Sequence, residues 1–572
     1  SRLPSLPLAD QEKLGMRSSF SSLLQRKLSS SVGSEGSMIR RNITRSLALT
    51  TPRARKNIIP SSSRMAGTAF YLPRRSMHCT RPPSVEGPKG PEVSYSNAMG
   101  APPGASVFVK ENFQVEGGTL SKMQIVYETW GRLSRKKDNA VLLHCGMSAS
   151  SHACSTEQHP KKGWWEDFIG PGLALDTDLF FVICVNNLGS CYGSTGPSSI
   201  DPNKSSSNNN NNIPYGSSFP TFSVQDQVRS QFALLDHLGI QRLHASVGSS
   251  LGGMQSLCAA SLFPDRIGNV VSISACASTH PGSIAFRQLQ RECIMADPNW
   301  NNGDYYDGPP PTQGLRLARQ AGTITYRSGP EWQTRFGRTR TTDQLMIGEN
   351  FEIERYIRYQ GSKWSAAGVF DPNSVIWIST AMDAFTLEKE DENGELSMIE
   401  GVKSIQMPAL IIGVQTDVLF PSWQQKQVAD LLRAAGNKSV TYYELDSLYG
   451  HDTFLLDKVS IGGAVKGHLE QEPNGANHIL RDAACGASLM LRTLQTQDFS
   501  RDTMDEVFHR LDTDHDGFVD FDEVVALIFL VQQSRGDRQT LKDIRESIAK
   551  FKTEGQPICK EDFFCLAFMD CD

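Results

Sequence analysis

Short apolar runs alternate with amphipathic segments through the middle of the chain. Ala140–His144 and Leu243–Val247 are apolar runs of strand length, and each ends in a turn rich in Gly and Ser. Between them, Ser223–Leu238 repeats apolar residues at the spacing of a helix. Further strand candidates are Ser106–Lys110, Lys122–Trp130, Leu179–Asn186, Asn269–Ser274, Ala409–Val414 and Val440–Leu445. This alternation predicts an α/β fold with a mainly parallel sheet and helices on both faces.

The alternation stops between Ser274 and Pro408, where the pattern is helical and irregular. We expect an insertion at about 280–405 that covers the carboxyl edge of the sheet as a lid. The main domain then spans 105–493, and a small separate module follows at 499–572. Ser205–Asn212 has low complexity and predicts an exposed loop.

Residues 1–90 differ in composition from the rest. Met38–Val85 contains no Asp or Glu but ten Arg and Lys residues, with many Ser and Thr between them. A basic, hydroxylated and acid-poor segment is typical of a transit peptide, and we predict a mitochondrial protein. The alternatives are a disordered basic tail and a cytoplasmic location. A secretory signal would need an apolar core after the charges, and none follows.

The composition of the chain indicates which classes of binding partner are unfavourable. The chain has 572 residues, 39% of them hydrophobic, and a formal net charge of -5 at pH 7. This small charge argues against nucleic acid or a charged membrane as the main partner, and no apolar run approaches the roughly 18 residues of a membrane-spanning helix. The 12 cysteines follow no metal-ligand spacing and predict reduced thiols. The sequence is compatible with a homodimer.

A nucleophile motif lies between a predicted strand and a helix-compatible run. Gly248-Ser249-Ser250-Leu251-Gly252 matches G-x-S-x-G. The glycines permit a sharp turn that lifts the central serine above the sheet, so Ser250 is the candidate nucleophile. The backbone N–H of Leu251 is expected to face the developing oxyanion. Taken alone, the same residues also suit a structural Gly/Ser turn.

Two downstream residues complete a triad in the chain order serine, acid, histidine. Asp417 and His451 each follow a strand candidate. The carboxylate can orient the imidazole, which takes the proton of Ser250 and returns it to the leaving group. The loop after the first apolar run is expected to supply a second oxyanion donor, and the backbone N–H of Met147 is the candidate.

Several other stretches add a family resemblance. They are Gly248-Ser-Ser-Leu-Gly-Gly-Met-Gln255, Asp297-Pro-Asn-Trp300, Gly303-Asp-Tyr-Tyr306, Thr323-Ile-Thr-Tyr326, Phe336-Gly-Arg338, Asp417-Val-Leu-Phe-Pro421 and Gly450-His-Asp-Thr-Phe454. Over roughly 108–493 the chain resembles the homoserine/serine O-acyltransferases of the α/β-hydrolase superfamily. The resemblance implies ping-pong transfer of an acyl group from a coenzyme A thioester, through acyl-Ser250, to an amino-acid hydroxyl. No cofactor is expected for the catalysis itself.

The resemblance also assigns substrate residues. Arg319, with Arg316 as its rival, is expected to hold the α-carboxylate of the acceptor, Asp452 its α-ammonium, and Tyr326 to line the same pocket. The loop Cys145–His152 is similar to the serine-using fungal branch, so we expect L-serine as acceptor and acetyl-CoA as donor, in cysteine biosynthesis. Homoserine, in methionine biosynthesis, and a succinyl donor stay open, since one methylene is worth only about 1–3 kcal/mol.

The C-terminal module carries an EF-hand pattern and predicts bound Ca²⁺. Gly517 permits the sharp turn, and a second, ligand-poor EF-hand is expected from Ile544–Phe551 and Asp562–Ala567. The expected ligands are Asp512, Asp514, Asp516, the carbonyl of Phe518, Asp520 through water, and Glu523.

Two other functions are compatible with parts of this pattern. A plain esterase or thioesterase shares the triad, but it has no need of Arg319 and Asp452 as an amino-acid clamp. A calcium-binding protein with an inactive catalytic domain conflicts with the intact triad.

Overall fold

The structure is a computed structural model that describes residues 98–204, 213–366, 368–470, 489–490, 501–512, 517–535, 548, 557–560 and 562–563. The expected leader and the low-complexity run lie outside these residues, so the transit peptide and the mitochondrial location stay predictions. Among the described helices, none combines the length and the apolar content that crossing a membrane requires.

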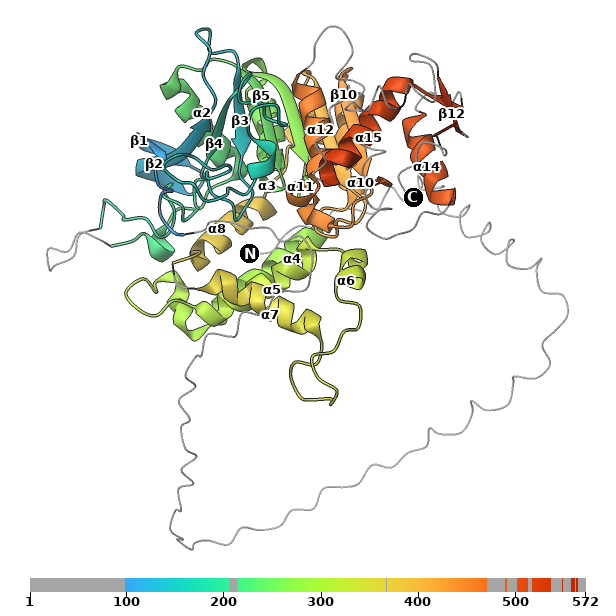
Figure 1. The fold of residues 1–572 in the computed structure, drawn as a ribbon. Helices are drawn as coiled ribbons and strands as arrows, with labels where there is room; N and C mark the ends of the chain where they lie inside the picture. Colours follow the sequence, from blue (N-terminus) through green and yellow to red (C-terminus); the bar gives the residue numbers. More distant parts are fainter. Residues whose placement is uncertain are drawn as a thin grey trace, which may run out of the picture. The chain divides into compact units, whose positions relative to one another are not determined.

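An eight-stranded sheet lies at the centre of the fold (Figure 1), in the order β1-β2-β4-β3-β5-β6-β9-β10. The strand β1 pairs antiparallel with β2, and β2 pairs antiparallel with β4, whereas the remaining neighbours are parallel. The predicted mainly parallel sheet is therefore confirmed. The strands are β1 (Ser106–Val115), β2 (Gly118–Trp130), β3 (Ala140–His144), β4 (Phe181–Val185), β5 (Leu243–Ser249), β6 (Ile267–Ile273), β9 (Ala409–Val414) and β10 (Val440–Leu445).

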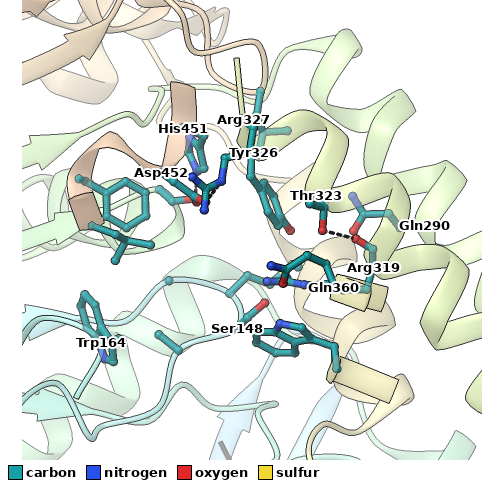
Figure 2. Close-up of a pocket in the computed structure, with 18 of the residues that line it drawn as sticks. Ser148, Trp164, Gln290, Arg319, Thr323, Tyr326, Arg327, Gln360, His451 and Asp452 are labelled. Atoms are coloured by element: carbon teal, nitrogen blue, oxygen red, sulfur yellow. Dashed lines mark hydrogen bonds and ion pairs between the residues drawn. The ribbon is translucent and has the colours of Figure 1, made fainter. Parts of the chain in front are cut away.

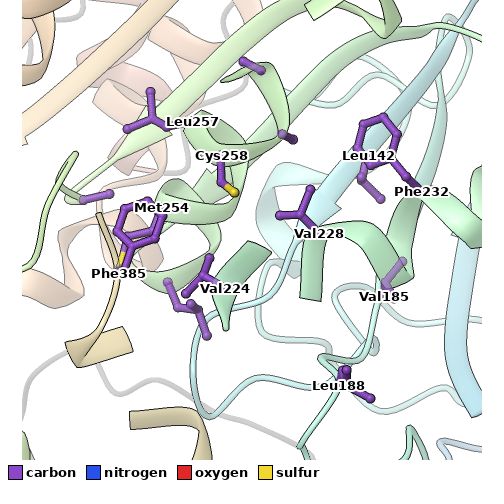
Figure 3. Packing of buried hydrophobic residues seen from close by; sticks show 14 of the residues in the cluster. Leu142, Val185, Leu188, Val224, Val228, Phe232, Met254, Leu257, Cys258 and Phe385 are labelled. Carbon is purple, nitrogen blue, oxygen red and sulfur yellow. The ribbon is translucent and has the colours of Figure 1, made fainter. Parts of the chain in front are cut away.

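Helices cover both faces of the sheet, because successive side chains of a strand point to opposite sides. Leu142 of β3 packs with α2 (Val224–Leu238) and α3 (Leu251–Leu262) in the apolar cluster of Figure 3. Its neighbours Val141 and Leu143 pack on the other face with α12 (Lys458–Leu469). The helix α10 (Ser422–Ala434) joins α2 and α3 on the first face.

The stretch between β6 and β9 forms a helical insertion, which Figure 1 shows below the sheet. Within it α5 packs against both α4 and α7. The insertion contains α4 (Pro281–Met295), α5 (Thr312–Tyr326), α6 (Gly329–Arg335), α7 (Glu352–Ser365), α8 (Pro372–Asp383), the hairpin β7 (Lys389–Glu390) with β8 (Leu396–Ser397), and α9 (Met398–Val402). The helical insertion expected at about 280–405 is present, and its role as a lid over the carboxyl edge of the sheet stays a prediction.

The described part of the C-terminal module is a helix, a short strand and a second helix. They are α14 (Arg501–Leu511), β11 (Phe518–Val519) and α15 (Phe521–Arg535), and β11 pairs antiparallel with β12 (Ile558–Cys559). The ligand candidates Asp514 and Asp516 lie outside the described residues, as does most of the second expected EF-hand. The EF-hand assignment therefore stays a prediction.

Candidate active site

Ser250 lies in the turn that joins β5 to α3, in a backbone conformation that only close packing maintains. Its φ is 56° and its ψ is -125°, a region that residues other than glycine rarely adopt. The turn also needs glycine nearby, because a Cβ on Gly248 would lie 2.1 Å from the carbonyl oxygen of Gly252. The backbone N–H of Ser250 donates to the carbonyl of Ile273 on β6 at 2.9 Å. The predicted strand-turn-helix context of the motif is thus present.

The three residues of the expected triad form a hydrogen-bonded chain. The Ser250 Oγ lies 3.0 Å from His451 Nε2, and His451 Nδ1 lies 2.7 Å from Asp417 Oδ2. The second carboxylate oxygen, Asp417 Oδ1, accepts the backbone N–H groups of Leu419 at 2.9 Å and Phe420 at 2.8 Å. All three triad side chains are buried. Because Asp417 is fixed on both oxygens, it holds the imidazole in one orientation.

The charge of Asp417 sets the proton affinity of His451. Burial alone lowers the pKa of His451, but the negative charge and the hydrogen bond of Asp417 outweigh it. The pKa of His451 therefore lies above the usual histidine value. Because only the neutral imidazole can take a proton from Ser250, the reactivity of the serine must fall as the pH drops below this pKa.

Ser250 and His451 line a pocket that is completed by the helical insertion (Figure 2). The pocket lining also includes Met147, Arg319, Tyr326 and Asp452, so four of the residues expected from the sequence meet there. Leu251 follows Ser250 directly and begins α3, where the first backbone N–H groups have no partner within the helix. The structure therefore places every expected catalytic and substrate residue at one site.

Arg319 is the arginine that faces the pocket. Its guanidinium carbon lies 3.8 Å from the ring centre of Trp364 and 5.0 Å from that of Tyr326, and its Nε makes no hydrogen bond to any described residue. The rival Arg316 bonds Gln313 on the exposed side of α5 and is not part of the lining. An arginine stacked on aromatic rings with unused donors is suited to bind a carboxylate.

Asp452 is paired with a residue that sequence reasoning missed. Its Oδ2 lies 3.0 Å from Arg327 Nε, as Figure 2 shows, and Nη1 of Arg327 donates to Glu331 Oε1 at 2.8 Å. Arg327 and Glu331 are both buried. The ion pair fixes the Asp452 carboxylate beside His451. The only sequence signal for Arg327 was its place directly after the family-like stretch that ends at Tyr326.

Arg287 of α4 is a second missed residue of the pocket lining. Its side chain is only 3% exposed, and its Nε donates to Asp383 Oδ1 at 2.5 Å. Both terminal nitrogens of its guanidinium are buried and make no hydrogen bond to any described residue. A buried cation with unused donors is costly unless a ligand supplies their partner. No sequence pattern distinguished Arg287 from the other arginines of the insertion.

The loop after β3 contains no Cys/His site. The imidazole of His144 lies 2.9 Å from Gln231 Oε1 and 2.7 Å from Ser246 Oγ, whereas the thiol of Cys145 lies 3.1 Å from the carbonyl oxygen of Ser150. The two side chains thus point to different partners, as expected for adjacent residues leaving a strand.

Comparison with known proteins identifies relatives of this chain. The family model described as alpha/beta hydrolase fold matches residues 139–458. A serine O-succinyltransferase of Emericella nidulans is 46% identical over 415 residues, which cover 62% of this chain and 78% of that protein. A homoserine O-acetyltransferase of Deferribacter desulfuricans is 41% identical over 366 residues, 63% of this chain and 93% of that protein.

Solved structures are similar over the same region. Esterase E22 and the homoserine O-acetyltransferase from Bacillus anthracis are each 27% identical, with a TM-score of 0.57. The likeness covers 64% of this chain in both cases, and 99% and 98% of those chains.

We predict that Asp417→Asn slows the reaction of Ser250 with a serine-directed phosphonate by about 10⁴-fold at its pH plateau. The acid limb of the rate is also expected to move to lower pH, because the carboxylate that raises the pKa of His451 is gone. Labelling rates from pH 5 to 9 in both proteins measure this. An acid limb at the same pH in both would contradict the role of Asp417.

Proposed function

The chain belongs to the α/β-hydrolase fold family, and from this premise we propose that it transfers a succinyl group from succinyl-CoA to the hydroxyl of L-serine. It is an acyltransferase, and its relatives are named for serine or homoserine as acceptors. The choice of serine rests on the names of relatives and on the loop Cys145–His152. The choice of succinyl rests on the two terminal guanidinium nitrogens of Arg287, which make no hydrogen bond to any described residue.

Each half of the reaction uses the same proton path. In the first half, His451 takes the proton of Ser250 as Oγ attacks the thioester carbonyl, and it returns that proton to the sulfur of CoA as the carbon–sulfur bond breaks. In the second half, His451 takes the proton of the acceptor hydroxyl, whose oxygen attacks the acyl-serine ester. The proton then returns to Ser250 Oγ, and the O-acyl amino acid leaves.

The acceptor is proposed to bind between opposite charges. Arg319 offers unused donors to its α-carboxylate, and Asp452, beside His451, faces its α-ammonium. Such a clamp places the acceptor hydroxyl next to the imidazole and lets it compete with water for the acyl-serine. A plain esterase needs no such pair, which favours the transferase over the hydrolase.

The proposed donor follows from Arg287, whose two terminal nitrogens are buried without a hydrogen bond to any described residue. An acetyl group has no charge, so the acetyl-CoA expected from the sequence would leave the two terminal nitrogens of Arg287 without a partner. A succinyl group ends in a carboxylate, which can accept hydrogen bonds from both nitrogens. The acetyl donor stays the alternative to be tested beside it.

We further propose that the loop 512–523 binds Ca²⁺. Asp512 follows the end of α14, and its Oδ2 accepts the backbone N–H of Gly517 at 3.1 Å, where φ is 85°. Glu523 lies in the first turn of α15, and its Oε2 accepts the backbone N–H of Asp520 at 3.1 Å. These two hydrogen bonds lie at the described ends of a segment whose sequence is rich in carboxylates, and together they support the proposal of a calcium site.

The proposed function predicts thiol release from succinyl-CoA that depends on L-serine and disappears in Ser250→Ala. The assay compares succinyl-CoA with acetyl-CoA, and L-serine with L-homoserine. Faster release with homoserine would contradict the acceptor, and faster release with acetyl-CoA the donor. Equal release without any acceptor would mean that the enzyme is a hydrolase.

Replacing Arg287 is expected to change the donor preference. Arg287→Met should lower kcat/KM for succinyl-CoA by about 10²-fold and leave that for acetyl-CoA within about threefold, since only the succinyl carboxylate loses a buried charged partner. The control is Arg291→Met, because Arg291 pairs with the same Asp383 at 2.6 Å but does not line the pocket. An equal loss for both donors in Arg287→Met would contradict the assignment.

Calcium binding is expected at one site per chain, measured by titration calorimetry of the whole protein. Glu523→Gln should weaken the binding at least about tenfold, because Glu523 is expected to supply both of its oxygens. Glu506→Gln on α14, whose side chain is 56% exposed, is the control and should bind like the unmodified protein. The absence of heat with Ca²⁺ in the unmodified protein would refute the site.

A further inference from the structure

A chain of buried amide side chains lies behind the loop that carries Met147. Gln227 and Gln231 belong to α2, Gln255 to α3, and Asn187 follows β4. All four are at most 1% exposed. The helices α2 and α3 also contribute apolar side chains, such as Val228 and Met254, to the cluster of Figure 3. Burying an amide without hydrogen bonds is costly, so every amide of such a chain must be hydrogen-bonded. A fully hydrogen-bonded chain is rigid.

The hydrogen bonds fix the direction of the first amides. Burial lowers the pKa of His144 to about 3, although its bond to Gln231 opposes this, so the imidazole is neutral. It faces the oxygen of Gln231, which leaves the Nε2 of Gln231 to donate to Gln255 Oε1 at 3.4 Å. The Nε2 of Gln255 then donates to Gln227 Oε1 at 2.8 Å and to Asn187 Oδ1 at 2.9 Å.

The orientation of the Asn187 amide determines how it bonds to the loop that carries Met147. With its oxygen bonded to Gln255, its Nδ2 donates to the carbonyl oxygens of Cys145 and Gly146, both at 3.3 Å. The carbonyl of Gly146 and the N–H of Met147 belong to one peptide group. In a planar trans peptide, the C=O and the N–H point in opposite directions. Holding the Gly146 oxygen behind the loop therefore turns the Met147 N–H to the front, where Gly146, Met147 and Ser250 line the pocket.

No side chain packs beside the α-carbon of Gly146. A Cβ placed there would meet no atom within 4 Å, so close packing at this position does not restrain the glycine. Glycine also has the widest choice of backbone conformations. A rotated peptide would present its carbonyl oxygen, not its N–H, to the negative charge that develops on the acyl oxygen. Within the loop, the Gly146 carbonyl oxygen also accepts the backbone N–H of Ala149 at 3.3 Å. The bonds from Asn187 are the restraint that reaches this peptide from outside the loop.

We propose that Asn187 is a positioning residue that holds the Gly146–Met147 peptide with its N–H aimed at the oxyanion, and that Gln255 orients the Asn187 amide. This inference rests on the proposed acyl-transfer function. It assigns to Asn187 an effect on the formation and breakdown of acyl-Ser250, without contact with substrate. The effect belongs in kcat and in the rate of acylation, and the KM for L-serine should change little.

The test is the variant Asn187→Leu, with two readouts. Stopped-flow release of p-nitrophenol from p-nitrophenyl succinate measures acylation of Ser250, and steady-state transfer from succinyl-CoA to L-serine measures kcat and KM. We expect acylation and kcat to fall by about 10–10²-fold, less than the loss of a whole oxyanion donor, with KM for serine within about threefold. Asn187→Asp keeps the size of the side chain and removes both N–H donors. Its acylation rate and kcat should fall at least as far, and it replaces the leucine variant in the test if that variant does not fold.

The matched control is Asn437→Leu. Asn437 is also buried, and its Nδ2 donates to two loop carbonyls, those of Ile405 at 2.8 Å and Met407 at 2.9 Å, but it does not line the pocket. The control should lose thermal stability and keep acylation within about threefold. Folded Asn187 variants that acylate like the control would overturn the proposal. Acylation without transfer to serine in the unmodified protein would refute the proposed acceptor and leave the test of Asn187 intact.

Discussion

The turn from β5 to α3 is the constraint on which the site depends. Gly248 and Gly252 approach so closely that a Cβ on Gly248 would lie 2.1 Å from the carbonyl oxygen of Gly252, and Ser250 between them has a φ of 56°. That conformation places Oγ 3.0 Å from His451 and the N–H of Leu251 at the start of a helix. Strain of this kind costs on the order of 1–3 kcal/mol and persists only because the packed sheet and α3 over-determine it.

The pocket contains charged side chains, and two of its arginines have guanidinium nitrogens without a hydrogen bond to any described residue. Asp452 is held by Arg327, so that its position beside His451 is fixed before any ligand binds. Arg319 and Arg287, by contrast, keep donors that no described residue uses. Two cations with unused donors suit two carboxylates, which in the proposed reaction are those of the acceptor and of a succinyl donor. The helical insertion supplies both arginines, whereas Asp452 and the reacting groups Ser250 and His451 follow strands of the sheet.

Sequence reasoning succeeded where the signal is local and ordered. The strands were readable because buried parallel strands are continuous apolar runs, and Ser250, Asp417 and His451 because each follows such a run in the required order. Arg287 and Asn187 were missed for a different reason. Their importance lies in what they do or do not touch after folding, and no spacing reveals a buried guanidinium that keeps two nitrogens without a hydrogen bond. The calcium loop is the opposite case, since its pattern is clear while two of its ligand candidates lie outside the described residues.

Mass spectrometry of the acyl-enzyme tests the central claim most directly. The unmodified protein is mixed with succinyl-CoA, quenched in acid and digested, and the peptide containing Ser250 is examined before and after L-serine is added. The account predicts one succinyl group on Ser250 that L-serine removes far faster than water does. An unmodified Ser250 peptide, or a succinyl group lost equally fast without serine, would contradict it.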